Sequence, residues 1–229
     1  MDSKSGDRMK IKKDCRAMIS EAFNAAIIVF VGVGIYAMLT FKGSGTGLTS
    51  QGWENLKYFT VLSNIFCGIV ALLRLILDIF FNKKLPILPK LMAASAVGLT
   101  FAIIAFFLAP MYPDLDMYQG GNRYFHLIVP LIAMVEFLFL ETKEKIPFKY
   151  AIWSAALALV YGMGYLINIL VNGIGVWPET NDWYGFLNWG FPVGMVIFAV
   201  IVLMDFGVAC LMRFLNHLVN KLINNIFKH

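Results

Sequence analysis

Six long apolar runs dominate this chain and leave it few folds to adopt. Of its 229 residues, 59% are hydrophobic and only 14% are charged. A helix needs about 20 apolar residues to span a bilayer, so six spans occupy roughly 120 positions and leave no room for a separate soluble catalytic domain. We predict an all-α, polytopic membrane protein with six transmembrane helices, at about 22–41, 58–81, 87–109, 124–140, 150–172 and 187–212.

Lysine and arginine are sorted by loop, and this sorting sets the orientation. Only Lys42, Lys57 and Arg123 fall in the loops on one side, whereas the opposite loops and both tails are basic. Because cytoplasmic loops carry the basic excess, we expect both termini in the cytoplasm. The same sorting accounts for the net charge of +5 without a nucleic-acid partner. We expect the plasma membrane if the protein is bacterial, and the endoplasmic reticulum or the plasma membrane if it is eukaryotic.

The two tails differ in pattern from the spans. Residues 1–21 are polar and basic, and we expect a cytoplasmic tail followed by a retained anchor, since no cleavage motif follows the first apolar run. Residues 22–212 form the predicted six-helix transmembrane domain. In 213–229, apolar residues recur at helical spacing opposite asparagine and lysine, which predicts an amphipathic helix on the inner membrane surface.

Several other motifs have ordinary interpretations. The glycine-rich segment 43–52 lacks the G-K-[ST] ending of a phosphate loop, so we interpret it as a flexible outer loop. No histidine pair or cysteine cluster indicates a metal, and we expect no cofactor. The cysteines form no C-x-x-C pair, which argues against a thiol-disulfide relay: Cys15, Cys67 and Cys210. The fifth span repeats a small residue every four positions, which predicts close packing of a neighbouring helix: Ser154, Ala158 and Gly162.

The ionisable residues inside the spans include a set toward the cytoplasmic side: Arg74, Asp78, Glu136 and Asp205. Our favoured interpretation is a charge-compensating network. Arg74 would pair with Asp78 at i,i+4, or with Glu136 or Asp205 across helices. The alternative is a proton or ion path, which needs polar groups continuing through the bilayer. The upper half of the sixth span offers almost none.

A second pair of polar residues lies nearer the outer surface. Thr60 comes three positions after Lys57 and His126 three after Arg123, so both lie about one turn below the outer interface. Pro130 removes the helical donor to the His126 carbonyl and loosens the helix there. An isolated threonine in a span usually bonds to its own helix. A neutral imidazole can nevertheless take a hydroxyl proton, which makes Thr60 the candidate nucleophile and His126 its base.

Three further polar residues share the helix face of Thr60, at offsets of three, four and seven: Ser63, Asn64 and Cys67. Asn64 and Ser63 are candidates for oxyanion or orienting roles, together with backbone N–H groups freed near the proline. Cys67 is a rival nucleophile. It lies about 10 Å deeper along the helix than Thr60, so packing is its favoured role.

Two segments, K-Y-F-T-V-L-S-N from Lys57 and H-L-I-V-P-L-I-A-M-V-E from His126, resemble the signature stretches of the androgen-induced and androgen-dependent TFPI-regulating membrane proteins. The stretch Gly175 to Leu187 is similar to the aromatic loop before the last span of that family, with an insertion. Members are six-span threonine hydrolases that cleave fatty acid esters of hydroxy fatty acids (FAHFA). The resemblance implies Thr60 as nucleophile and His126 as base. It implies no oxyanion role for Asn64.

These observations predict an intramembrane lipid esterase acting on a lipid ester with long acyl chains. Thr60 would attack the ester while His126 accepts its proton and returns it to the leaving alcohol. Water activated by the same His126 would then release the fatty acid from the acyl-threonine. Two alternatives stay open. One is a membrane acyltransferase that uses the same acyl-enzyme. The other is a non-enzymatic lipid-binding or transport protein in which Thr60 and His126 only hydrogen-bond across helices.

Overall fold

A computed structural model describes residues 3–40, 52–114, 117–141, 145–176 and 180–226, with only the backbone in 3–14 and at 224 and 226. These ranges are all-helical, as predicted, with six helical segments long and apolar enough to cross a membrane. Except for Gly52, the glycine-rich segment 43–52 lies outside the described residues. The helices are α1 (Ser3–Thr40), η1 (Gly52–Lys57), α2 (Phe59–Phe81), α3 (Ile87–Ile103), η2 (Ile104–Leu108), α4 (Ala109–Met111), α5 (Gly120–Arg123), η3 (Tyr124–Ile128), α6 (Val129–Phe139), α7 (Phe148–Asn172) and α8 (Phe191–Ile226).

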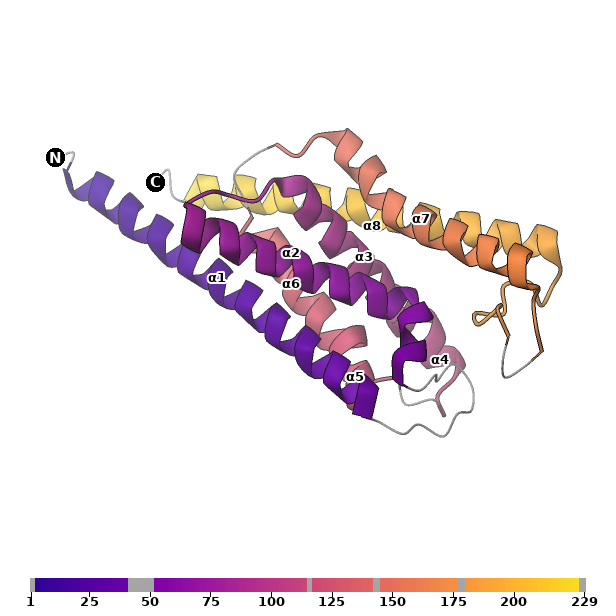
Figure 1. Ribbon diagram of the computed structural model, residues 1–229. Coiled ribbons are helices and arrows are strands. Elements are labelled where there is room, and N and C mark those ends of the chain that lie inside the picture. Colours follow the sequence, from indigo (N-terminus) through magenta and orange to yellow (C-terminus); the bar gives the residue numbers. More distant parts are fainter. Residues whose placement is uncertain (1–2, 41–51, 115–116, 142–144, 177–179, 227–229) are drawn as a thin grey trace.

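Both chain ends lie at the same end of the bundle, here called the inner end, as six crossings require (Figure 1). Helix α3 is central and packs against α2, α6, α7 and α8. Residues 93–100 of α3 are all buried, and many of them are small: Ala93, Ala94, Ser95, Ala96 and Gly98. Small residues let neighbouring backbones approach closely. Helices α1, α2 and α6 therefore gather on one side of α3, while α7 and α8 form an antiparallel pair on the other (Figure 1).

Two π-helical turns, η2 and η3, lie toward the opposite, outer end, and each is followed after one residue by a proline. Because proline has no N–H, the helix loses a donor at that position. In both places the residue before the proline donates to a carbonyl five residues earlier: Ala109 to Ile104, before Pro110, and Val129 to Tyr124, before Pro130. His126 lies in the middle of η3. The loosening expected near Pro130 therefore takes the form of a π turn.

The end helices are longer than the predicted spans. Helix α8 has 36 residues and continues through Met212 without a break, since no glycine or proline follows Gly207 within it. Residues 213–226 are thus the inner end of α8 and not a separate helix. Their place on the inner membrane surface stays a prediction. Asn216 anchors this extension by donating to the carbonyls of Phe137 at 2.8 Å and Glu141 at 2.7 Å. From Ser3 onward, the predicted basic tail is likewise the first part of α1.

Two charge clusters join the helices of the inner half, one partly buried and one fully buried. Arg74 pairs with Asp78 at 2.7 Å, which confirms the i,i+4 prediction, and with Glu141 at 3.1 Å. Glu136 lies in the other cluster, where its partner is Lys90 of α3 at 2.7 Å. Two side chains of α1 also donate to Glu136: Ser20 at 2.8 Å and Asn24 at 2.9 Å. The charge network predicted from the sequence did not include Lys90, because a lysine near the start of an apolar run is typical of an inner loop.

The small-residue face of α7 packs closely, as predicted. Ser154, Ala158 and Gly162 are all buried. A Cβ atom added at Gly162 would lie only 1.5 Å from the Phe198 ring of α8, so no larger residue fits without displacing that ring. This contact fixes the approach of α7 to α8 beside the cavity described next.

Candidate functional site

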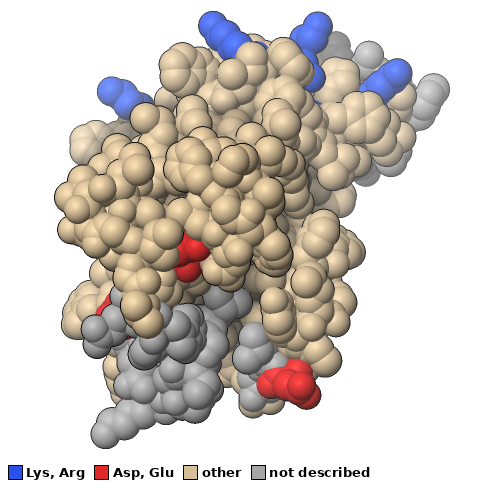
Figure 2. All heavy atoms as spheres, turned by 90° about the vertical axis from the view of Figure 1, so that its right-hand side faces the viewer, with Lys and Arg blue, Asp and Glu red and all other residues tan. Residues whose placement is uncertain are grey.

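A cavity of about 960 Å³ lies at the outer end, between α2 and α3 on one side and α7 and α8 on the other. This volume is at the upper end of the range for small-molecule sites. Much of the wall is apolar and includes Leu99, Ile103, Phe198 and Ile201. Figure 2 views the molecule from this end and shows a largely uncharged face. The largely apolar wall of the cavity suits a ligand with long apolar chains.

The loop at residues 180–188 lines the outer end of the cavity, and Asp182 organises it. Asp182 is only 5% exposed. Its two carboxylate oxygens accept the backbone N–H groups of Phe186 and Leu187, each at 2.9 Å, and the hydroxyl of Tyr165. Since all these groups lie in the loop or on α7, the carboxylate fastens the loop to that helix.

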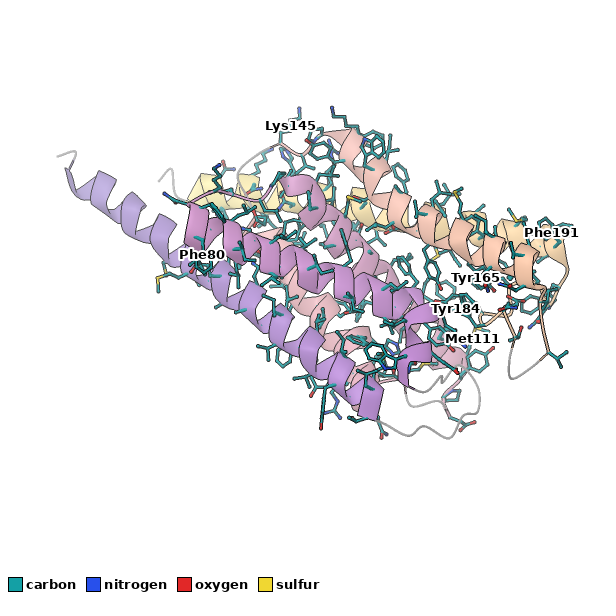
Figure 3. The ribbon with its side chains drawn as sticks, viewed as in Figure 1. Phe80, Met111, Lys145, Tyr165, Tyr184 and Phe191 are labelled. Carbon is teal, nitrogen blue, oxygen red and sulfur yellow. The ribbon has the colours of Figure 1, made fainter. Side chains whose placement is uncertain are left out.

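Aromatic side chains connect the same loop to the start of α2. The Tyr184 hydroxyl accepts the backbone N–H of Phe59 at 2.9 Å, and Trp183 donates to the Tyr161 hydroxyl at 3.2 Å. Tyr165, Tyr184 and Met111 all line the cavity and lie near one another at the outer end (Figure 3). Burial raises the pKa of Tyr184 well above its ordinary value, so the phenol remains protonated at neutral pH.

Thr60 is the second residue of α2 and lines the cavity. Neither its hydroxyl nor its backbone N–H has a hydrogen-bond partner among the described residues. The first N–H groups of a helix lack intrahelical acceptors, and the helix dipole favours negative charge beside them. Thr60 therefore offers a ligand both a free hydroxyl and a free donor at the positive end of a 23-residue helix.

His126 is buried in η3, and its ring has a defined tautomer. Nδ1 lies 2.6 Å from the carbonyl oxygen of Met117. A carbonyl can only accept, so Nδ1 is assigned the proton and Nε2 the lone pair, as a general base requires. Nε2 has no hydrogen-bond partner in the described part of the chain. His126 does not line the cavity, and no hydrogen bond joins it to Thr60 within the described ranges.

Asn64 bridges the two helices that carry these residues. It is fully buried, and its amide nitrogen donates to the carbonyls of Thr60 at 2.7 Å and Phe125 at 3.0 Å. An amide has two N–H donors, and both are used, so an orienting role fits Asn64 better than an oxyanion role. Ser63 donates to the same Thr60 carbonyl at 3.1 Å and contacts the Thr100 hydroxyl at 3.2 Å.

Cys67 lies apart from the cavity. It is 3% exposed and belongs to an apolar core with Ile27, Val31 and Val97. It lines a separate void of about 10 Å³, which has room for about one water molecule. This environment favours Thr60 over Cys67 as the residue that meets a ligand. Among the described residues, no group of three or more His, Cys, Asp or Glu side chains is arranged to hold a metal.

No protein-family model, curated protein or solved structure matches this chain. The resemblance to the TFPI-regulating proteins therefore stays a prediction. The mechanism predicted from the sequence needs a groove between helices at the level of Thr60, but the sequence could not say which helices line it. The signal for its outer end was the aromatic loop before the last span, whose Trp183 and Tyr184 line it.

Proposed function

We propose that this protein is an intramembrane lipid ester hydrolase with Thr60 as nucleophile and His126 as base. The observation that carries the proposal is the unbonded Thr60 hydroxyl, which lines a largely apolar cavity at the start of α2. The neighbouring π turn supplies a histidine whose Nδ1 is held by a carbonyl, leaving Nε2 as the base. The Asn64 bridge supports this pairing, because it joins the carbonyl of Thr60 to that of the residue before His126.

In this mechanism the acyl chains lie along the apolar wall and the ester carbonyl reaches Thr60. As the Thr60 hydroxyl attacks the carbonyl carbon, His126 Nε2 accepts its proton. The free N–H at the start of α2 donates to the developing oxyanion. His126 then returns the proton to the departing alkoxide, which leaves an acyl-threonine. Nε2 next takes a proton from water, whose oxygen attacks the acyl carbon, and that proton restores the Thr60 hydroxyl as the fatty acid leaves.

The proposed substrates are esters between two long chains, and fatty acid esters of hydroxy fatty acids are the first to test. Two long chains match a cavity whose walls are largely apolar and whose polar groups lie mainly near its outer end. Such a substrate enters from the bilayer rather than from water. Its ester group then lies at the depth of Thr60, close to the outer interface.

Hydrolysis by the purified protein in lipid nanodiscs tests the proposal. Thr60→Ala and His126→Gln should each lower kcat by about 10²- to 10⁴-fold, the range typical of acid–base catalysis. Thr40→Ala is the matched control, because among the described residues the Thr40 hydroxyl bonds to its own helix, at the Tyr36 carbonyl and more weakly at that of Ala37. Full activity in both site variants would contradict the proposal, and so would transfer of the acyl group to an added lipid alcohol in place of hydrolysis.

A further inference from the structure

Behind the inner end of the cavity lies a layer of buried polar side chains. One residue from each of three helices, α3, α7 and α8, lines the cavity there: Leu99, Ala158 and Ile201. These three residues are called the cavity floor. One turn farther toward the inner end, each helix carries a polar residue that is 0% exposed: Ser95, Ser154 and Asp205. Helix residues four apart share a face, so these three side chains lie behind the floor.

The packing of the helices brings the three polar residues to a similar level. Gly162 of α7 faces Phe198 of α8, and Phe148 contacts Phe206 with ring centroids 5.9 Å apart. Interpolating between these contacts puts Ser154 within about one helical turn of Asp205 along α8. Helix α3 contacts α8 in the same region, since a Cβ atom added at Gly98, one turn after Ser95, would lie 3.0 Å from Val208, one turn after Asp205. The Ser95 hydroxyl is bonded to the Met92 carbonyl at 3.2 Å.

Asp205 is exceptional among the described acidic residues, because both its carboxyl oxygens are buried without a hydrogen-bond partner. The Ser154 hydroxyl does not compensate it, since that group donates to the Tyr150 carbonyl at 2.9 Å. An ionised carboxylate without a partner is strongly disfavoured in such surroundings, and a group in this position takes up a proton. The neutral carboxylic acid is therefore the form that this site accommodates.

No charge in the described part of the chain compensates Asp205. The titratable groups on the helices that pack against or carry it are Lys90 on α3, Glu136 on α6, Lys149, Tyr150, Tyr161 and Tyr165 on α7, and Cys210, Arg213, His217 and Lys221 on α8. Lys90 and Glu136 pair with each other. Arg213 donates to the Ile146 carbonyl at 2.7 Å. None of these groups forms an ion pair or hydrogen bond with Asp205.

We propose that Asp205 is a proton-binding site coupled to the cavity. It holds a proton while the floor is closed. It releases that proton to water only when the floor of Leu99, Ala158 and Ile201 opens. Release of the proton leaves a carboxylate that water must solvate, so opening of the floor favours proton release. By the same coupling, protonation of Asp205 favours the closed floor. A proton fits better than a metal ion, because Asp205 is the single carboxylate there and both serine hydroxyls donate to their own helices. This proposal does not depend on Thr60 or His126.

Infrared spectroscopy of the full chain in nanodiscs tests the protonation state. The wild type should show the C=O stretch of a protonated carboxylic acid at neutral pH, and Asp205→Asn should lose it. Asp114→Asn, which changes an exposed carboxylate at the cavity mouth, should keep it. The proposal fails if the band is missing from the wild type, survives in Asp205→Asn, or disappears on adding Na⁺ at constant pH. If Asp205→Asn does not fold, Asp205→Leu replaces it.

Thiol labelling tests the coupling to the floor. Ile201→Cys is introduced after Cys15, Cys67 and Cys210 have been replaced, and a small reagent is added from the outer side. Raising the pH should increase the labelling rate of Ile201→Cys several-fold more than that of Ile201→Cys combined with Asp205→Asn. In the combined variant, only ionisation of the thiol contributes to the increase. An identical pH profile in the two backgrounds would overturn the coupling.

Discussion

The side-chain nitrogen of Asn64 lies 2.7 Å from the carbonyl oxygen of Thr60 and 3.0 Å from that of Phe125. One buried amide therefore ties the first turn of α2 to the π turn that contains His126. Backbone carbonyls move little once their helices are packed, so this bridge sets the relative position of the proposed nucleophile and base.

Asn64→Leu should weaken catalysis by disturbing the relative position of Thr60 and His126. The substitution removes both bonds and leaves the Phe125 carbonyl without this donor in an apolar setting, at a cost of about 1–3 kcal/mol. We expect kcat to fall at least tenfold with little change in KM, as measured by hydrolysis kinetics beside thermal unfolding. Asn172→Leu is the control, since Asn172 is exposed and bonds only to Asn168. An unchanged kcat in a folded Asn64→Leu would refute the orienting role.

Asp182→Asn should detach the loop that lines the outer end of the cavity. An amide cannot accept at both positions, so one side-chain N–H would face the backbone N–H of Phe186 or Leu187. Hydrogen exchange in residues 182–188 should rise and the apparent KM for a long-chain ester should increase. Glu54→Gln, which changes an exposed carboxylate that does not line the cavity, should leave both unchanged. Equal protection of the loop from hydrogen exchange in Asp182→Asn and in the wild type would show that the Asp182 carboxylate does not hold it.

Gly162→Ala should narrow the cavity. The new methyl group would overlap the Phe198 ring, and such overpacking costs about 1–3 kcal/mol. Activity on long-chain esters should fall more than activity on short-chain esters, and a second change, Phe198→Leu, should restore part of it. Gly164→Ala is a close control, because nothing lies within 4 Å of its added Cβ. Equal losses for both chain lengths would exclude a role in chain accommodation.

Lys90 and Glu136 should show strong coupling in stability. Removing one partner by Lys90→Met leaves a buried, uncompensated carboxylate, which costs about 3–5 kcal/mol. Adding Glu136→Gln should recover much of that loss. A double-mutant cycle of unfolding free energies in mild detergent measures the coupling. Additive losses would show that the two charges are not paired.

The sequence predicted the large-scale fold correctly because apolar length and glycine or proline breaks are local properties. Six spans, the Arg74–Asp78 pair and the small-residue face of α7 all follow from such patterns. The end of the sixth span did not, since nothing between Met212 and Ile226 interrupts the helix. There the sequence changes in polarity but not in helical propensity.

The candidate site was only partly predictable. Depth along two helices singled out Thr60 and His126, but spacing along a helix says nothing of rotation about it or of which helices adjoin. Asn64 could therefore be placed on the face of Thr60, while its bond to Phe125 depends on a tertiary contact. The Lys90–Glu136 pair and the walls of the cavity could not be predicted for the same reason, because each is formed by helices that meet only in the folded bundle.

Covalent labelling identifies the nucleophile. A fluorophosphonate lipid ester analogue is added to the protein in nanodiscs, and the modified residue is mapped by mass spectrometry of its peptides. Our account predicts one adduct on Thr60, formed much more slowly in His126→Gln and not at all in Thr60→Ala. An adduct on Cys67, or hydrolysis of the lipid ester that continues in Thr60→Ala, would contradict it.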